Sequence, residues 1–203
     1  MDAQGREVEI KLELLAEDPL AALARRLGDP ARTVEQLNRY FIPAAPAGWM
    51  VRFREEDGGL VLTVKGPRET PSQTAPGEGS DREAGVFVRT EREVPVAPEA
   101  LLHLLPGEDQ SWLFALAPLA GLTGPLRPAG SCRNTRRFFH HAGFTLELDR
   151  TEYPDGSIDW ELEVETDRPD EAFPEVSALL SALGIPFRPA TKGKFARTLE
   201  RMK

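Results

Sequence analysis

Residues 7–15 read EVEIKLELL, and this segment decides the fold. Charged and apolar side chains alternate strictly over positions 7 to 14, which is the period of a β-strand rather than of a helix. Residues 51–55 and 60–65 have the composition of two more strands, and they flank the turn sequence Asp57-Gly58-Gly59. The sequence therefore predicts antiparallel strands joined by tight turns.

Further segments extend this pattern along the chain. Strands are predicted at residues 33–42, 86–94, 132–140, 144–153 and 158–166. Helices are predicted at residues 19–27, 169–183 and 194–202, with short helical patches at 98–105 and 111–116. About seven or eight strands in consecutive hairpins favour a single α+β domain, residues 1–203, with an antiparallel sheet or barrel and helices outside it or at its ends.

Composition limits the classes of function. The chain has 203 residues, of which 40% are hydrophobic, and this is enough apolar material for a folded core. Its 25 basic and 33 acidic residues give a net charge of −8, which argues against general nucleic-acid binding because phosphate backbones attract basic surfaces. Residues 66–85 are rich in Pro, Gly, Ser and charge, and we expect them to form a flexible loop inserted in the domain.

The sequence contains no recognisable targeting or membrane segment. It lacks a run of about 18 apolar residues, and its first residues lack the apolar stretch of a secretory signal. The single cysteine, Cys132, has no partner for an internal disulfide. We therefore expect a cytoplasmic monomer or homodimer with no nucleic-acid partner and no membrane association.

The unusual feature is the charge on the polar faces of the predicted strands. The residues on these faces are Glu7, Glu9, Lys11, Arg52, Arg54, Thr63, Lys65, Arg89, Glu91, Glu93, Glu147, Asp149, Glu161, Glu163 and Glu165. Facing water, they would form solvated ion pairs that contribute little stability. Facing into a closed barrel, they would line a wet tunnel that is costly unless it binds metals and an anion. The alternation alone leaves both orientations open.

Seven short motifs follow one another along the chain. They are Glu7-x-Glu9-x-Lys11, Arg52-x-Arg54, Leu62-Thr63-Val64-Lys65, Arg89-x-Glu91-x-Glu93, Asn134-x-Arg136-Arg137, Leu148-Asp149 with Glu161-Leu162-Glu163, and Gly193-Lys194-Phe195. In this order they resemble the motifs of the CYTH, or triphosphate tunnel metalloenzyme, superfamily. The resemblance extends over about residues 6 to 200.

This resemblance implies an eight-stranded antiparallel β-barrel, the triphosphate tunnel, which binds a small-molecule triphosphate substrate with Mg²⁺ or Mn²⁺. By position, the metal ligands would be Glu7, Glu9, Asp149, Glu161 and Glu163. The substrate-binding residues would be Lys11, Arg52, Arg54, Lys65, Arg89, Glu91, Arg136, Arg137 and Lys194. Lys11 and Tyr40, on the next strand, resemble a catalytic pair proposed to activate water in some members. Because Gly193 stands where a serine is usual, Lys192 is an alternative to Lys194.

The expected function is metal-dependent hydrolysis of a triphosphate, with inorganic tripolyphosphate as the substrate. The alternatives are a thiamine or nucleoside triphosphatase, a cyclase of the class IV adenylyl type, and a non-catalytic polyphosphate-binding module. The resemblance implies a tryptophan two positions before the first of the paired arginines in thiamine-specific members. This chain has Met50 at that position. Trp49 beside it is expected to face the opposite side of the strand.

Overall fold

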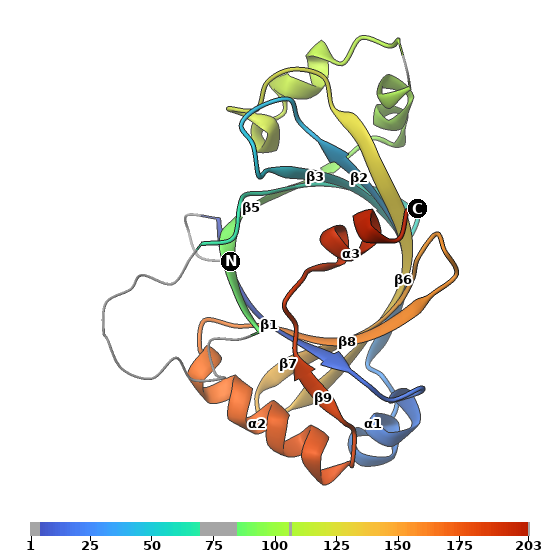
Figure 1. Cartoon of the computed structure of the whole chain (residues 1–203), viewed down its shortest axis with the longest axis vertical. Coiled ribbons are helices and arrows are strands. Elements are labelled where there is room, and N and C mark those ends of the chain that lie inside the picture. Colours follow the sequence, from blue (N-terminus) through green and yellow to red (C-terminus); the bar gives the residue numbers. More distant parts are fainter. Residues whose placement is uncertain (1–4, 70–84, 106, 203) are drawn as a thin grey trace.

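The structure is a computed structural model that describes residues 5–69, 85–105 and 107–202. Within these residues, eight antiparallel strands close into a barrel (Figure 1). The strands are β1 (Arg6–Leu14), β2 (Arg32–Ile42), β3 (Met50–Glu56), β4 (Gly59–Lys65), β5 (Val86–Val96), β6 (Arg127–His141), β7 (Phe144–Glu152) and β8 (Ile158–Glu165). Around the barrel their order is β1-β5-β4-β3-β2-β6-β7-β8, and β8 pairs with β1 to close it. The predicted fold class is confirmed.

Two features of the strands follow from local sequence. In the β3–β4 turn, Asp57 and Gly58 both have positive φ angles of 48° and 75°, as an Asp-Gly hairpin turn requires. A ninth strand, β9 (Phe187–Pro189), pairs with Leu12–Leu14 at the edge of β1. The sequence did not predict β9, because a three-residue segment that contains proline is too short to show the alternation of apolar and polar residues typical of a strand.

The helices lie where the sequence predicts them. They are α1 (Leu20–Leu27), α2 (Pro169–Ala182) and α3 (Lys194–Glu200). The two predicted helical patches are 3₁₀-helices, η1 (Pro98–Leu104) and η2 (Ser111–Ala115), and a third, η3 (Ala117–Leu119), follows them. None of the helices in the described residues is long and apolar enough to cross a membrane. Most of the predicted loop at 66–85 lies outside the described residues.

The hydrophobic core lies outside the barrel, in two clusters. On one side, α1 and α2 cover the outer faces of β1, β7 and β8, where Leu12, Leu146 and Leu180 are fully buried. On the other side, η1 to η3 cover the outer faces of β3 and β4, where Phe53 and Leu62 are fully buried (Figure 1). Because the apolar face of each strand faces these outer clusters, its charged face must line the interior.

Candidate functional site

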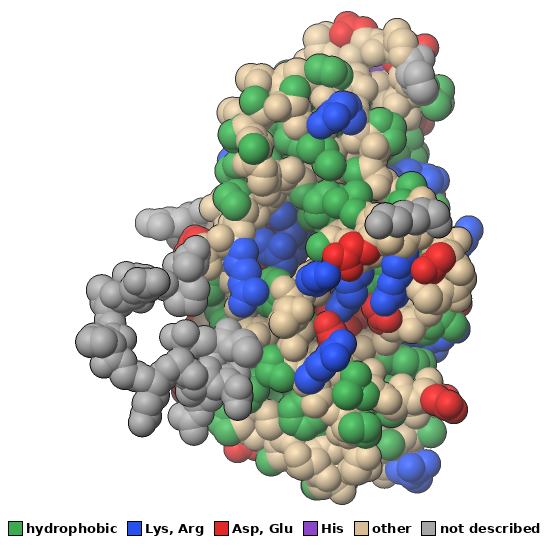
Figure 2. All heavy atoms as spheres, viewed as in Figure 1, with side chains coloured by type: hydrophobic (Ala, Val, Ile, Leu, Met, Phe, Trp, Pro, Cys, Tyr) green, Lys and Arg blue, Asp and Glu red, His purple; other side chains and the backbone are tan. Residues whose placement is uncertain are grey.

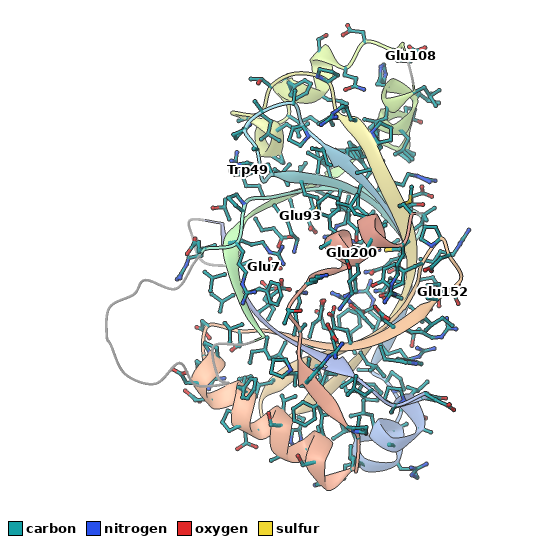
Figure 3. All side chains as sticks on the ribbon, in the orientation of Figure 1. Glu7, Trp49, Glu93, Glu108, Glu152 and Glu200 are labelled. Atoms are coloured by element: carbon teal, nitrogen blue, oxygen red, sulfur yellow. The ribbon has the colours of Figure 1, made fainter. Side chains whose placement is uncertain are left out.

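The charged faces of the strands point into the barrel, so the inward orientation is the one found. They surround a cavity of about 250 Å³. Its lining includes eight acidic side chains, Glu7, Glu9, Glu56, Glu91, Glu93, Glu147, Glu163 and Glu165, and eight basic ones, Lys11, Arg32, Arg52, Arg54, Lys65, Arg89, Arg136 and Lys194. Figure 2 shows Lys and Arg side chains around a hollow at the centre of this face. In Figure 3, Glu7 and Glu93 lie inside the ring of strands, whereas Glu152 lies outside it.

One wall of the cavity, formed by β3, β4 and β5, is rich in cations. Arg52 donates a hydrogen bond to the Thr63 hydroxyl (3.1 Å), and Lys65 lies 2.7 Å from a carboxylate oxygen of Glu91. Arg89 extends from β5 towards β1, where it binds Glu7 and Glu9. These guanidinium and ammonium groups match the hydrogen-bonding needs of phosphate oxygens.

The opposite wall of the barrel, formed by β7 and β8, carries three buried carboxylates, Asp149, Glu161 and Glu163. Glu163 is among the residues that line the cavity, whereas Asp149 and Glu161 are not and instead bind Lys194, which does line it. Asp149 and Glu161 face each other across the two strands, and Glu163 is two residues further along β8. One oxygen from each can be chosen so that all three oxygens lie within 4.8 Å of one another. Three carboxylate oxygens at this spacing are the hard donors that Mg²⁺ and Mn²⁺ prefer.

The Lys194 ammonium group lies among these three carboxylates. Its Nζ is 2.7 Å from Asp149 Oδ2, 2.7 Å from Glu161 Oε1 and 2.6 Å from Glu163 Oε1. The three oxygens therefore converge on one position, and a positive charge fits there. This arrangement fits a divalent cation bound by Asp149, Glu161 and Glu163.

Glu7 and Glu9, which were also predicted to bind metal, lie on β1. Glu7 accepts hydrogen bonds from Lys65 (2.9 and 3.0 Å), and Glu9 lies 2.7 Å from Lys11. Both carboxylates are buried and each is paired with a lysine and with Arg89. They line the same cavity as Glu163, and the structure brings them together with cations rather than into the three-carboxylate group.

The pKa values in the acidic wall diverge because burial and ion pairing compete. Burial would raise the pKa of Glu163, but Lys11, Lys194 and Arg136 outweigh burial and hold this pKa well below its usual range. For Glu161, burial dominates and the pKa is raised. Burial also raises the pKa of Glu147, to about 7, although Arg136 opposes this shift. The carboxylates of one wall thus differ in how readily they ionise.

Lys11 and Tyr40, the predicted catalytic pair, both line the cavity, Lys11 on β1 and Tyr40 on β2, the next strand along the chain. Around the closed barrel, β2 lies four strands from β1 in either direction, so the two residues come from opposite sides. Lys11 binds Glu9 and Glu163, whereas the Tyr40 hydroxyl lies 3.8 Å from the Cys132 thiol. Burial raises the pKa of Tyr40 well above its usual value, so its hydroxyl stays protonated.

Three further sequence questions are answered by side-chain placement. Arg137 is not among the residues that line the cavity, because neighbouring residues of a strand face opposite sides and Arg136 faces inward. Lys192 is half-exposed and binds Glu200, so Lys194 is the lysine inside the barrel. Met50 lines the cavity, whereas Trp49 packs against the outer cluster (Figure 3), as strand alternation predicts.

Several charged cavity residues and one supporting residue were not predicted as part of the site. The cavity residues are Arg32, Glu56, Glu93, Glu147 and Glu165, and each of the four glutamates lies two positions from a predicted site residue on the same strand. Arg197, on α3, is buried and binds Glu161 through Nη2 at 2.6 Å. A helical spacing of three from Lys194 could have indicated that Arg197 faces the same way.

Comparisons with known proteins agree with this geometry. The family model described as the CYTH domain matches residues 5–199. A candidate adenylyl cyclase from Hippeastrum, HpAC1, which is described as having a dominant triphosphatase activity, is 25% identical, with a TM-score of 0.75 over 96% of this chain and 95% of that chain. A candidate adenylate cyclase from Bacillus halodurans is 21% identical, with a TM-score of 0.63 over 95% of this chain and 98% of that chain, and supports the fold alone. A search of curated protein sequences finds no match.

Proposed function

This chain belongs to the CYTH domain family, and from that membership and the cavity we propose that it hydrolyses inorganic tripolyphosphate in a reaction that requires Mg²⁺ or Mn²⁺. The observation that carries the proposal is the pairing of a cationic wall and an acidic wall across one barrel. A cationic wall on β3, β4 and β5 faces three convergent carboxylates on β7 and β8. The triphosphatase activity described for HpAC1 supports the same reaction class.

The charge balance of the cavity supports a metal requirement. Its lining has eight basic and eight acidic side chains, and Asp149 and Glu161 add two more carboxylates beside Glu163, so the site has no excess positive charge for a ligand with several negative charges. A divalent cation held by Asp149, Glu161 and Glu163 would supply that charge and would stabilise the phosphoryl group during transfer. The protein itself would orient the triphosphate, because Arg52, Arg54, Lys65 and Arg89 can exchange their carboxylate partners for phosphate oxygens.

The lining also supports an inorganic substrate. The side chains with apolar surface in the cavity wall are Val34, Tyr40, Met50, Phe138 and Phe195, and the rest of the lining is charged, polar or glycine. Tyr40, Met50 and Phe195 belong to one small apolar cluster beneath α3. Little apolar surface is therefore left to bind a nucleobase or a thiamine ring, whereas the cationic wall offers several donors to phosphate oxygens.

The test is phosphate release from tripolyphosphate, ATP and thiamine triphosphate in parallel, with Mg²⁺, Mn²⁺ or EDTA. We expect EDTA-sensitive release with the highest kcat/KM for tripolyphosphate. Glu161→Gln should lower kcat by about 100-fold or more, because the charge that binds the metal is lost. The matched control is Glu152→Gln, an exposed carboxylate on β7 outside the barrel, which should retain full activity.

Three results would contradict the proposal in different ways. Formation of cyclic AMP from ATP would identify a cyclase. A preference for thiamine triphosphate would identify the organic substrate. Binding of tripolyphosphate without turnover, measured by calorimetry, would identify a binding module.

A further inference from the structure

The three carboxylates of the acidic wall share one pattern of contacts. Each directs one oxygen to the Lys194 ammonium group, at 2.6 to 2.7 Å. The second oxygen of each carboxylate is held by a guanidinium group. Arg136 donates hydrogen bonds to Asp149 Oδ1 (2.8 Å) and to Glu163 Oε2 (2.6 Å). For Glu161, the corresponding donor is Arg197, whose Nη2 lies 2.6 Å from Oε2.

Arg197 is itself held in place from several directions. Its Nε donates a hydrogen bond to the Tyr153 hydroxyl (2.9 Å), and Asp159 Oδ2 lies 3.4 Å from the same Nε. The side chain is 6% exposed, and the Glu161 side chain that it binds is 1% exposed. The planar guanidinium group therefore bridges Tyr153 and Glu161 in one fixed orientation.

Arg197 is not among the residues that line the cavity, and of the three carboxylates it binds Glu161. Its effect on the site is therefore assigned to Glu161. We propose that Arg197 is a positioning residue that fixes the Glu161 carboxylate so that Oε1 faces the cation site, an inference that rests on the proposed metal-dependent function. Groups that orient metal ligands in this way commonly change metal affinity by about 10-fold or more when they are removed.

A competing effect has the opposite sign. Arg197 carries a positive charge, and its removal would relieve repulsion of a bound cation. Two observations favour positioning over repulsion. First, Arg197 contacts the oxygen of Glu161 that does not contact Lys194. Second, Arg136, which carries the same positive charge as Arg197, already binds the other two carboxylates. Without Arg197, the buried Oε2 loses its guanidinium partner, and the carboxylate must turn to find another.

The experiment measures Mn²⁺ binding to the full chain without substrate, by electron paramagnetic resonance of free Mn²⁺. Arg197→Ala should raise the Kd for Mn²⁺ by about 10-fold. In steady-state assays, the Mn²⁺ concentration for half-maximal activity should rise equally, whereas KM for tripolyphosphate at saturating Mn²⁺ should change by less than about twofold. The matched control is Arg201→Ala, directly after the same helix; Arg201 binds Asp159 and contacts the Tyr153 ring, and no contact with Glu161 is found among the described residues. This control should bind Mn²⁺ as wild type does.

Two milder variants keep the proposal testable if Arg197→Ala does not fold. Tyr153→Phe removes only the hydroxyl that orients Arg197, and it should weaken Mn²⁺ binding by about 2- to 3-fold. Arg197→Lys keeps the charge without the two-sided bridge and should give an intermediate loss. Wild-type affinity in all these variants, or tighter binding in Arg197→Ala, would overturn the inference alone. Failure of the wild-type protein to bind Mn²⁺ would overturn the proposed function and this inference together.

Discussion

Glu147 differs from the other carboxylates of the acidic wall in its ionisation. It lies two residues before Asp149 on β7 and pairs with Arg136, yet burial raises its pKa to about 7 from an ordinary value of 4.5. The folded protein therefore holds this proton more tightly than the unfolded chain does. As the pH rises from about 4.5 to about 7, the folded state loses stability, and above that range the loss is complete.

Replacement of Glu147 by glutamine should remove this pH-dependent loss of stability. In EDTA at pH 8, we expect Glu147→Gln to be more stable than wild type by about 1 to 2 kcal/mol, because one pKa unit corresponds to about 1.4 kcal/mol and local hydration reduces the full effect. At pH 5 the difference should be much smaller, because only a small part of the loss has developed there. Urea unfolding at both pH values provides the measurement, with the exposed Glu152→Gln as a control that shows no pH-dependent difference. A constant difference between pH 5 and pH 8 would contradict the assignment.

At the scale of single elements, the sequence predicts the strands well, but it does not predict which elements pack against each face of a strand. The alternation from Glu7 to Leu14 predicts β1, but an alternating strand has two faces and does not say which is covered. The outer helices decide this, because they bury Leu12 and its neighbours away from the barrel axis. Tyr40 lies on the next strand along the chain, β2, but succession along the chain does not specify neighbours in a closed barrel, and β2 lies four strands from β1.

The placement of α3 likewise depends on tertiary contacts. The motif Gly193-Lys194-Phe195 indicates a functional lysine, but only the folded chain brings Arg197 to Glu161 and Phe195 against Tyr40. The Phe195 and Tyr40 rings have centroids 5.3 Å apart, within a cluster that includes Met50. This cluster seats α3 across one end of the barrel (Figure 1) and so determines where Lys194 lies.

Phe195→Ala should therefore affect substrate binding through the helix. We expect a loss of about 1 to 2 kcal/mol in stability, less than for a fully buried phenylalanine, because Phe195 is only half-buried. KM for tripolyphosphate should rise by about 3- to 10-fold, because Lys194 is no longer held in position. Phe173→Ala is the matched control: Phe173 is also half-buried, on α2, and packs against the outer cluster. It should cost similar stability with an unchanged KM, and an equal rise of KM in both variants would contradict a specific role for the α3 contact.

For the whole molecule, the barrel is a folded domain with its apolar core outside and a balanced set of charges inside. The eight basic and eight acidic side chains that line the cavity form ion pairs, in which Asp149 and Glu161 also take part through Lys194. A divalent cation alone would add positive charge beside Lys194 and Arg136. A triphosphate alone would add negative charge beside Glu91 and Glu93. Each ligand by itself disturbs the balance, and when both bind, each offsets part of the charge of the other.

This balance predicts cooperative stabilisation by the two ligands. The measurement is calorimetric unfolding with EDTA, with Mg²⁺ alone, with a nitrogen-bridged, non-hydrolysable tripolyphosphate analogue alone, and with both. A ligand at 100 times its Kd contributes about 2.7 kcal/mol, which corresponds to a rise in Tm of roughly 5 to 10 °C for a chain of this size. We expect the pair to raise Tm by more than the sum of the separate shifts, and Glu161→Gln to abolish the excess, because the cation then lacks one of its three carboxylates. Additive shifts in the wild type would mean that the two walls bind independently, and the charge-balance argument would then be wrong.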